Sequence, residues 1–442
     1  MSDVVDSSET KSSTSTVVVT PPAREGPPPP PDGGLSAWST IAGAWMIQFC
    51  TFGYVSAFGV YQDFYALDFL PLYSSSDISW IGGLQLFLMY APGILVGRAF
   101  DAGYFHHLEI VGSLLYVFCM FMLSLTSRNQ YYQIILAQGV GMGIGLGLTF
   151  LPSLSIVSHH FRRRRALAVG IVVSGASAGG IVFPIMLNRL FQDPHVGFAG
   201  GVRASGGLVG GLLLLANALV RTRAPPRRLG SRMGLSWRSF KVVLRDGAYM
   251  WSIAGAFFTS MGSYIPLFYL QLFASDHGVN ARVTTYLLAI LNAGSIVGRI
   301  IPPFLADKWG VYALLLPSVF ASATLLFSIF GATTSAGAVI VGLLFGFASG
   351  AYISLIPSLL GVLCRDVSEL GVRMGFAYTV VAIAMLVGNP IAGALLNADA
   401  VNVQRVWWHA LVFAGLCTIV GFGFMCISGI LFHRRKERAS SA

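Results

Sequence analysis

The stretch YYQIILAQGVGMGIGLGLTFLPSLSIVSHHFRRRRALAVGIVVSGASAGGIVFPIML, at residues 131–187, decides the fold of this chain. It contains two uncharged, glycine-rich spans that are joined only by the basic turn HHFRRRR. Each span is long enough to cross a bilayer as a helix, because about 20 apolar residues cover a hydrocarbon core of about 30 Å. The arginines at 162–165 cannot lie in that core. The chain is therefore predicted to cross the membrane, turn at a basic cytoplasmic loop and cross back.

The composition of the whole chain agrees with a polytopic membrane protein. Of its 442 residues, 55% are hydrophobic and 10% are charged, whereas soluble domains carry about 25% charged residues. The net charge is +10, but the basic residues lie in short loops and not along one soluble face, which argues against nucleic-acid binding. The five cysteines have no paired spacing, so neither a disulfide framework nor a metal site is expected, and no cofactor is expected.

Twelve apolar spans follow an N-terminal segment that is rich in Ser, Thr and Pro. They are predicted at residues 38–62, 80–98, 108–126, 131–157, 166–187, 198–220, 248–272, 283–304, 311–331, 336–363, 372–396 and 406–432. The fold class is an all-α polytopic membrane protein with twelve transmembrane helices. The predicted domains are a disordered cytoplasmic tail at 1–37, an N-terminal six-helix bundle at 38–220, a basic cytoplasmic linker at 221–247, a C-terminal six-helix bundle at 248–432 and a cytoplasmic tail at 433–442.

The distribution of positive charge predicts the orientation in the membrane. Most of the 28 lysines and arginines fall in the tails and in the loops that this topology places inside the cell. An even number of crossings puts both termini on that side. We expect a multi-pass protein with cytoplasmic termini, in the plasma membrane rather than in an organelle membrane. The arginines at 162–165 are interpreted as determinants of topology that also contact lipid phosphates.

An internal repeat relates the two halves of the chain. Spans 4 and 10 share two glycines and a Pro-Ser-Leu sequence at one constant offset, and an aspartate follows both span 2 and span 8. The matching residues are Gly141, Gly145, Pro152, Ser153, Leu154 and Asp101 in the first half, and Gly346, Gly350, Pro357, Ser358, Leu359 and Asp307 in the second. Two homologous six-helix halves are expected to bind a substrate between them, near the middle of the membrane.

Alternating glycines fill the middle of span 4, from Gly139 to Gly147. On a helix they form two stripes with i, i+4 spacing, which allow neighbouring helices to approach closely. A phosphate-binding loop is the alternative, but no strand precedes these glycines and no Lys-Ser or Lys-Thr follows them. We therefore interpret them as packing residues.

Two six-helix halves with these aspartates resemble the major facilitator superfamily. The turn after span 2 contains Gly97 and Asp101, and its degenerate copy after span 8 contains Pro303 and Asp307. This resemblance implies two bundles that rock about a central site. It also implies that Asp101 and Asp307 act in gating, by capping or pairing across helices at the cytoplasmic end.

Two further segments resemble the signatures of the monocarboxylate porter family, in particular its fungal branch. The first is Asp-Gly-Gly at 32–34, followed by Trp38, and the second is HFRRRRALAVG at 160–170. The resemblance covers roughly residues 32–432. It implies transport of a small organic anion or a monocarboxylate-like metabolite.

Arg299 is the sharpest candidate for substrate binding. A charge inside a membrane helix costs about 2.5 to 3.5 kcal/mol and usually marks a transport pathway. Asn292, Ser295 and Arg299 follow i, i+3, i+7 spacing and share one helix face, so Arg299 is predicted to bind an anion that Asn292 and Ser295 orient. The alternative is that Arg299 extends along the helix to the cytoplasmic interface.

The family resemblance adds an expectation about proton coupling. In monocarboxylate porters an arginine at this position takes part in anion and proton coupling, with an aspartate four residues earlier and a lysine in span 1. Ser295 and Ser56 occupy those two positions here. No Asp or Glu lies mid-span, because Asp63 and Glu109 are near span ends, so proton coupling has no evident carboxylate relay.

Other polar and aromatic residues inside the spans are candidates for the cavity wall. For each one taken alone, helix packing is the commoner role, but their aromatic bias suits a larger or partly apolar substrate. These residues are Gln48, Tyr54, Thr149, Tyr264, Tyr352, Tyr378 and Asn389, of which Tyr54 and Tyr264 are predicted to bind substrate.

The sequence therefore predicts a secondary active or facilitative transporter of a small organic anion that works by alternating access. It is expected to be monomeric, with a small-molecule substrate and membrane lipids as its partners, and not to be an enzyme. One alternative is the same machine carrying or exporting a neutral or secondary metabolite. A second alternative is a non-transporting receptor with this fold, which the short predicted tails disfavour.

Overall fold

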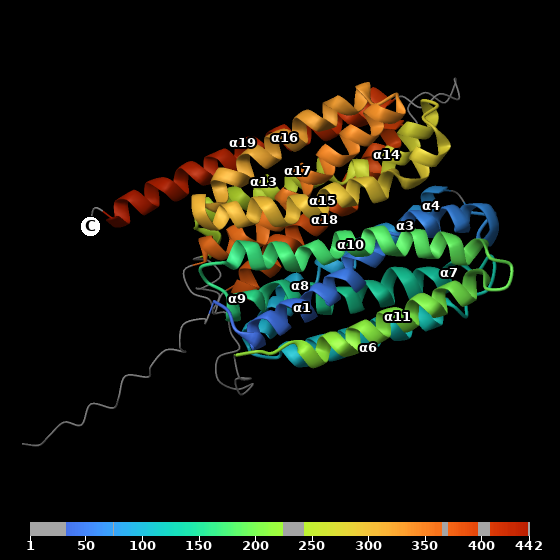
Figure 1. Cartoon of the computed structure of the whole chain (residues 1–442), viewed down its shortest axis with the longest axis horizontal. Coiled ribbons are helices and arrows are strands. Elements are labelled where there is room, and N and C mark those ends of the chain that lie inside the picture. Colours follow the sequence, from blue (N-terminus) through green and yellow to red (C-terminus); the bar gives the residue numbers. More distant parts are fainter. Residues whose placement is uncertain (1–31, 74, 224–242, 365–369, 397–406, 441–442) are drawn as a thin grey trace, which may run out of the picture.

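The computed structural model describes residues 32–73, 75–223, 243–364, 370–396 and 407–440. Within these ranges every regular element is helical (Figure 1). Twelve continuous helical runs are long and apolar enough to cross a membrane. The predicted all-α fold with twelve transmembrane helices is confirmed.

The first six crossings pack together as one bundle (Figure 1). Crossings 1, 2 and 4 consist of several helical segments, and Pro92 marks the break in crossing 2 because proline lacks a backbone N–H. The segments are α1 (Leu35–Cys50), α2 (Phe52–Val55), α3 (Phe58–Phe64), η1 (Tyr65–Phe69), α4 (Ser75–Tyr90), α5 (Gly93–Asp101), α6 (Phe105–Leu123), α7 (Tyr131–Ile134), η2 (Ile135–Met142), α8 (Gly143–Ser155), α9 (Val157–His160), α10 (Arg165–Gln192) and α11 (Gly197–Leu219).

The last six crossings form the second bundle (Figure 1). Its segments are α13 (Gly247–Ser263), α14 (Ile265–Asp276), α15 (Ala281–Trp309), α16 (Val311–Ser328), η3 (Ile329–Gly331), α17 (Ser335–Leu363), α18 (Leu370–Leu396) and α19 (Trp407–Ser440). The two bundles contact each other mainly through α10 with α15 and through α18 with α4 and α5.

One end of the molecule carries the start of α1, the turn between α9 and α10, and the end of α19 (Figure 1). We call it the basic end, because Arg162, Arg163, Arg164 and Arg435 lie there. The positive charge predicts that this end faces the cytoplasm. Helix α19 continues to Ser440, so residues 433–440 extend the last helix where a separate tail was expected. Residues 1–31 and 224–242 of the predicted tail and linker lie outside the described residues.

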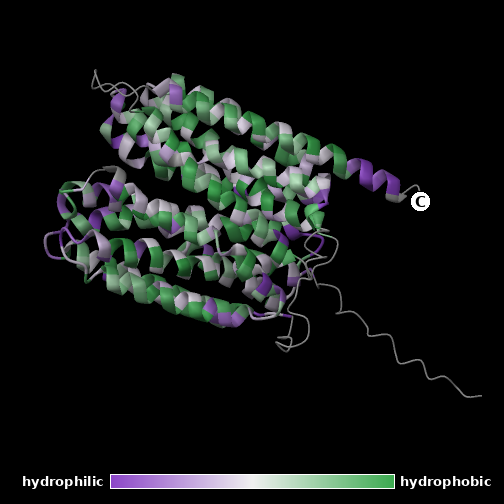
Figure 2. Cartoon of the chain, turned by 180° about the vertical axis from the view of Figure 1, so that it is seen from behind, coloured by the Kyte–Doolittle hydropathy of each residue, from purple (hydrophilic) through white to green (hydrophobic). Residues whose placement is uncertain are grey.

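The surface between the two ends is apolar. Hydrophobic residues cover most of the helices, and hydrophilic residues gather at the ends (Figure 2). On the outer helices large side chains are exposed, such as Leu114 on α6 at 67% and Leu214 on α11 at 76%. Contact of such apolar side chains with lipid is favourable, whereas their contact with water is unfavourable, so this surface suits a bilayer.

The glycine stripes of α8 and η2 are packing surfaces. A Cβ atom at Gly143 or Gly147 meets α4, and a Cβ atom at Gly141 or Gly145 meets α6. The matching glycines of α17, such as Gly346, approach the backbone of α15 in the same way. These close approaches confirm the interpretation of the glycines as packing residues, and they let three helices meet without side chains between them.

Candidate functional site

Each of the two repeated aspartates reaches across to the opposite bundle. Asp101, at the end of α5, accepts hydrogen bonds from the N–H groups of Gly371 and Val372 in the first turn of α18, both at 2.9 Å. Asp307, near the end of α15, accepts from Ala166 and Leu167 in the first turn of α10, also at 2.9 Å. A carboxylate at a helix N-terminus satisfies free N–H groups and complements the helix dipole.

The bundles touch through glycine backbones beside these aspartates. A Cβ atom at Gly97 would overlap the carbonyl group of Gly371, and a Cβ atom at Gly375 would overlap that of Gly93. In the other half of the repeat, a Cβ atom at Gly170 would overlap the carbonyl oxygen of Arg299. Within the described ranges, the basic end is therefore closed by helix-on-helix contact.

Arg165 adds a contact at the basic end that the sequence did not predict. Three of the arginines at 162–165 are exposed, as expected for residues that contact lipid phosphates, but Arg165 is less exposed. Its guanidinium lies against Gly361 near the end of α17, where a Cβ atom would overlap it. Arg165 thus joins the turn between α9 and α10 to the second bundle.

The two signature segments contact each other at the basic end. The carboxylate of Asp32 accepts hydrogen bonds from the backbone N–H groups of Arg162 and Arg163, at 2.6 and 2.7 Å. The rings of Trp38 and Phe161 pack edge to face with centroids 5.3 Å apart. The segment at the start of α1 therefore stabilises the turn between α9 and α10. The residues that follow this turn are the ones that Asp307 caps.

Arg299 lies between the bundles and is buried, with an exposed fraction of 3%. Its Nη1 donates to the carbonyl of Val173 on α10 at 2.7 Å, and its Nε donates to Ser295 Oγ at 3.0 Å. Its guanidinium lies near Tyr264 and Tyr90. The side chain does not extend to the interface, so the alternative interpretation of Arg299 does not describe this conformation.

The predicted partners of Arg299 share its helix face and are also engaged in packing. Ser295 Oγ accepts from Ser177 on α10 at 3.1 Å. Asn292 donates to the carbonyl of Leu288 at 2.9 Å, and its amide lies against Gly180. In this conformation the polar stripe of α15 is a seam between the bundles, and its role in binding substrate stays a prediction.

Five aromatic side chains meet between the two bundles, three from the first bundle and two from the second. Tyr90 stacks on Tyr378 with ring centroids 5.5 Å apart, and Phe52 packs against Tyr264 at 6.3 Å. We call this group the central aromatic cluster, which consists of Phe52, Tyr90, Phe150, Tyr264 and Tyr378.

The residues that the sequence suggested for the cavity wall lie partly in this cluster and partly inside the individual bundles. Tyr264 and Tyr378 belong to the cluster, whereas the Tyr352 hydroxyl bonds to Ser260 and to the carbonyl of Ala256 within the second bundle. Tyr54 is 1% exposed and forms hydrogen bonds with Tyr61 and Ser205, all within the first bundle, so the structure does not place it beside Arg299. Gln48 and Thr149 are also buried inside that bundle, and the side chain of Asn389 lies outside the described residues.

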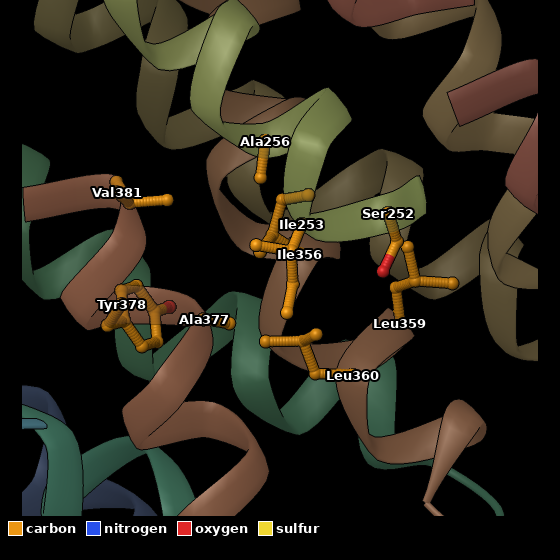
Figure 3. A pocket seen from close by; sticks show the side chains of 9 residues that line it. All are labelled: Ser252, Ile253, Ala256, Ile356, Leu359, Leu360, Ala377, Tyr378 and Val381. Atoms are coloured by element: carbon orange, nitrogen blue, oxygen red, sulfur yellow. The ribbon is translucent and has the colours of Figure 1, made fainter. Parts of the chain in front are cut away.

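A small apolar pocket lies next to the cluster, within the second bundle. Its side chains come from α13, α17 and α18, and Tyr378 forms part of its wall (Figure 3). Apart from the hydroxyl groups of Ser252 and Tyr378, the side chains that line it are aliphatic. The neighbourhood of the cluster therefore offers flat rings and hydrocarbon rather than charge.

Several residues at this site escaped the sequence interpretation. Phe52, Tyr90 and Phe150 were missed because aromatic residues are common throughout the spans, and their meeting depends on the packing of three separate helices. A signal for Arg165 was available, since it is the arginine nearest to the predicted start of span 5.

Comparison with known proteins agrees with this geometry. The sequence profile of the Major Facilitator Superfamily matches residues 35–368. An aspyridones efflux protein of Emericella nidulans is 37% identical over 399 residues, which are 90% of this chain and 79% of that protein. A fujikurins efflux protein of Gibberella fujikuroi is 34% identical and covers 92% of this chain and 85% of its own length. MFS-type transporter 1 of Ophiocordyceps is 35% identical, with coverages of 88% and 85%.

Solved structures share the fold at low sequence identity. The E. coli fucose:proton symporter matches with a TM-score of 0.67 at 15% identity and covers 88% of this chain and 98% of its own. The proton:xylose symporter bound to 6-bromo-6-deoxy-D-glucose matches with a TM-score of 0.70 at 15% identity, with coverages of 88% and 95%. From the family profile and the length and identity of the relatives, this chain belongs to the Major Facilitator Superfamily of membrane transporters.

Proposed function

We propose that this transporter exports a partly aromatic secondary metabolite by alternating access. The central aromatic cluster carries the proposal, because five rings from both bundles meet where the halves of such transporters bind substrate. Aromatic walls bind flat, apolar molecules through stacking and desolvation. A small monocarboxylate would leave most of this surface without a partner.

The relatives support export over the monocarboxylate transport that the two signatures suggested. Two of them are named for the efflux of aspyridones and fujikurins. An acidic group on the metabolite is compatible with the cluster, because the guanidinium of Arg299 lies near Tyr264 and Tyr90. Arg299 would then bind that group when the contact with Val173 opens.

The proposal is tested with inside-out membrane vesicles from yeast that expresses the full chain. Uptake of aspyridones and fujikurins into the vesicles is measured with and without a proton gradient. We expect transport that depends on the protein. If correctly inserted protein moves neither compound nor other aromatic metabolites, the export proposal is wrong and a receptor becomes the better interpretation.

Replacing Tyr378 or Tyr264 with leucine is expected to reduce this uptake roughly tenfold. Loss of one aromatic contact costs about 1.5 kcal/mol, which corresponds to that factor. The matched control is Tyr312→Leu, which removes a buried tyrosine of α16 that bonds to Ser428 outside the cluster. Equal losses in all three variants would point to general destabilisation and count against the cluster as the site.

We also propose that Asp101 and Asp307 latch the basic end in its closed conformation. Replacing either one with asparagine removes the negative charge at a helix N-terminus, which weakens the latch by about 1–2 kcal/mol. We therefore expect an impermeant thiol reagent to label a cysteine at Ser155 about tenfold faster, because Ser155 is buried against Met374 of the other bundle.

The control for this latch is Asp68→Asn, which removes an exposed ion pair with Arg128 away from the basic end. That variant should label at the rate of the parent. The repeat also predicts that the Asp101 and Asp307 variants behave alike, so a change in only one of them would contradict a symmetric latch.

A further inference from the structure

Glu109 is buried in the first bundle without a partner. It lies in the second turn of α6 with an exposed fraction of 1%, and neither carboxyl oxygen has a hydrogen-bond partner among the described residues. An ionised carboxylate in such a place costs several kcal/mol more than a neutral acid. The sequence interpretation did not consider Glu109 as a carboxylate relay because it lies near a span end. Burial of the side chain, and not its position along the helix, decides whether the carboxyl group is ionised.

The level of Glu109 in the bundle follows from the packing of α6 on α8. These helices are antiparallel, and a Cβ atom at Gly112 would meet Thr149. Glu109 precedes Gly112 by three residues, so it lies at about the level of Ser153. Glu109 therefore faces the interior of the bundle, one turn of α8 away from Phe150 of the central aromatic cluster.

Among the described residues, the polar groups at this level of the bundle are amides and hydroxyl groups. The amide nitrogen of Gln48 donates to Ser153 at 2.8 Å, and that of Asn217 donates to Ser113 at 3.2 Å, one turn along α6 from Glu109. The amide oxygens of both residues are buried and have no partner among the described residues. Acceptor oxygens repel a carboxylate, whereas they can accept the proton of a carboxylic acid.

In the part of the chain that the structure describes, no cation forms a hydrogen bond with Glu109. Helix α8 and η2 carry no ionisable group. Asp101 is engaged with α18, and Arg203 bonds to Ser124 at the opposite end of the bundle. Arg221, just after α11, lies near His106, at the start of α6. The ionisable groups on α6 and on the elements packed against it are His106, His107, Tyr116, Cys119, Cys50, Arg98, Asp101, Arg203 and Arg221.

We propose that Glu109 is a proton-binding site, which carries a proton while the basic end is closed. Helix α8 connects this site to the contact between the bundles, because it supplies Phe150 to the cluster and Ser155 to the contact with Met374. When the bundles rearrange and α8 moves, the carboxyl meets water or a new partner and releases its proton. Glu109 would thus couple the transport cycle to pH.

Infrared difference spectroscopy on the purified full-length protein in lipid nanodiscs tests the proton site directly. We expect a C=O stretching band of an un-ionised carboxylic acid at neutral pH. It should disappear in Glu109→Gln, shift in Glu109→Asp, and persist in Asp63→Asn, which removes an exposed carboxylate of the same bundle. If Glu109→Gln removes only a carboxylate band, or no band, Glu109 is not a proton-binding site.

Transport by the same variants tests the coupling and rests on the proposed export function. A rate that depends on one ionisation changes up to about tenfold per pH unit. Uptake of aspyridones into inside-out vesicles should depend on pH in the parent and become independent of pH in Glu109→Gln. A parent that moves no aspyridones contradicts the proposed export function but leaves the spectroscopic result to decide the proton site. An unchanged pH dependence in Glu109→Gln contradicts the coupling.

Discussion

Replacing Gly97 with leucine is expected to leave a folded protein in the membrane that transports roughly a hundredfold more slowly. The new Cβ atom would overlap the carbonyl group of Gly371, so α5 and α18 must separate for it to fit. The separation also withdraws the carboxylate of Asp101 from the first turn of α18. Overpacking and the lost hydrogen bonds together destabilise the closed conformation, and only that conformation, by about 3 kcal/mol. This free energy corresponds to the roughly hundredfold loss of rate.

The matched control is Gly211→Leu, since Gly211 is an exposed glycine of the same bundle and no atom lies near its Cβ position. Two measurements separate the outcomes. Uptake of aspyridones into inside-out vesicles reports the cycle, and thiol labelling of a cysteine at Ser155 reports opening of the basic end. Fast labelling with slow uptake is expected for Gly97→Leu. If both variants match the parent, the glycine contact does not close the transporter.

Replacing Arg299 with alanine is expected to abolish transport while leaving surface expression intact. The substitution removes the hydrogen bond to Val173 across the bundle interface and the positive charge beside Tyr264 and Tyr90. A charge-assisted hydrogen bond contributes about 1.5–3 kcal/mol, so the loss is at least about tenfold even if Arg299 acts only as a latch. Arg299→Lys should fail as well, because one ammonium cannot reproduce a guanidinium that donates in two directions.

A comparison of probes separates anion binding from latching by Arg299. Binding is measured with an acidic aromatic probe and with its methyl ester. If Arg299 binds an anion, Arg299→Ala weakens binding of the acid and spares the ester, whereas a latch affects both equally. Ser177→Ala is the control, because it removes a neighbouring contact across the interface and keeps the charge. Unchanged transport in Arg299→Ala would contradict both roles.

The residues that could be predicted from sequence are those whose signal is local or repeated. The aspartates at 101 and 307 stood out because the repeat placed them at equivalent positions, and the structure puts each one at a helix N-terminus of the other bundle. The glycine stripes were recognisable because helical periodicity alone assigns them to two faces. Arg299 was recognisable because charge is rare inside an apolar span.

The candidate site was harder to predict because it has no local pattern. Phe52, Tyr90 and Phe150 belong to three helices, and each one resembles the many other aromatic residues of the spans. Tyr54 looked equally suitable by sequence, yet it bonds to Tyr61 and Ser205 inside one bundle. Which aromatic residue faces the centre depends on the rotation of its helix, and that rotation is set by packing with neighbouring helices.

The sequence by itself therefore determined the number of crossings, the basic turn within 131–187 and the duplicated halves. These properties follow from the free-energy cost of placing charged groups and unpaired backbone groups in hydrocarbon. Each residue of a span contributes to this cost separately, so the pattern is visible in the sequence. Only the tertiary structure decided that Arg165 contacts Gly361, that Glu109 is buried with no hydrogen-bond partner among the described residues, and that five rings meet between the bundles. Those features are sums of contacts between distant segments, and no single segment contains them.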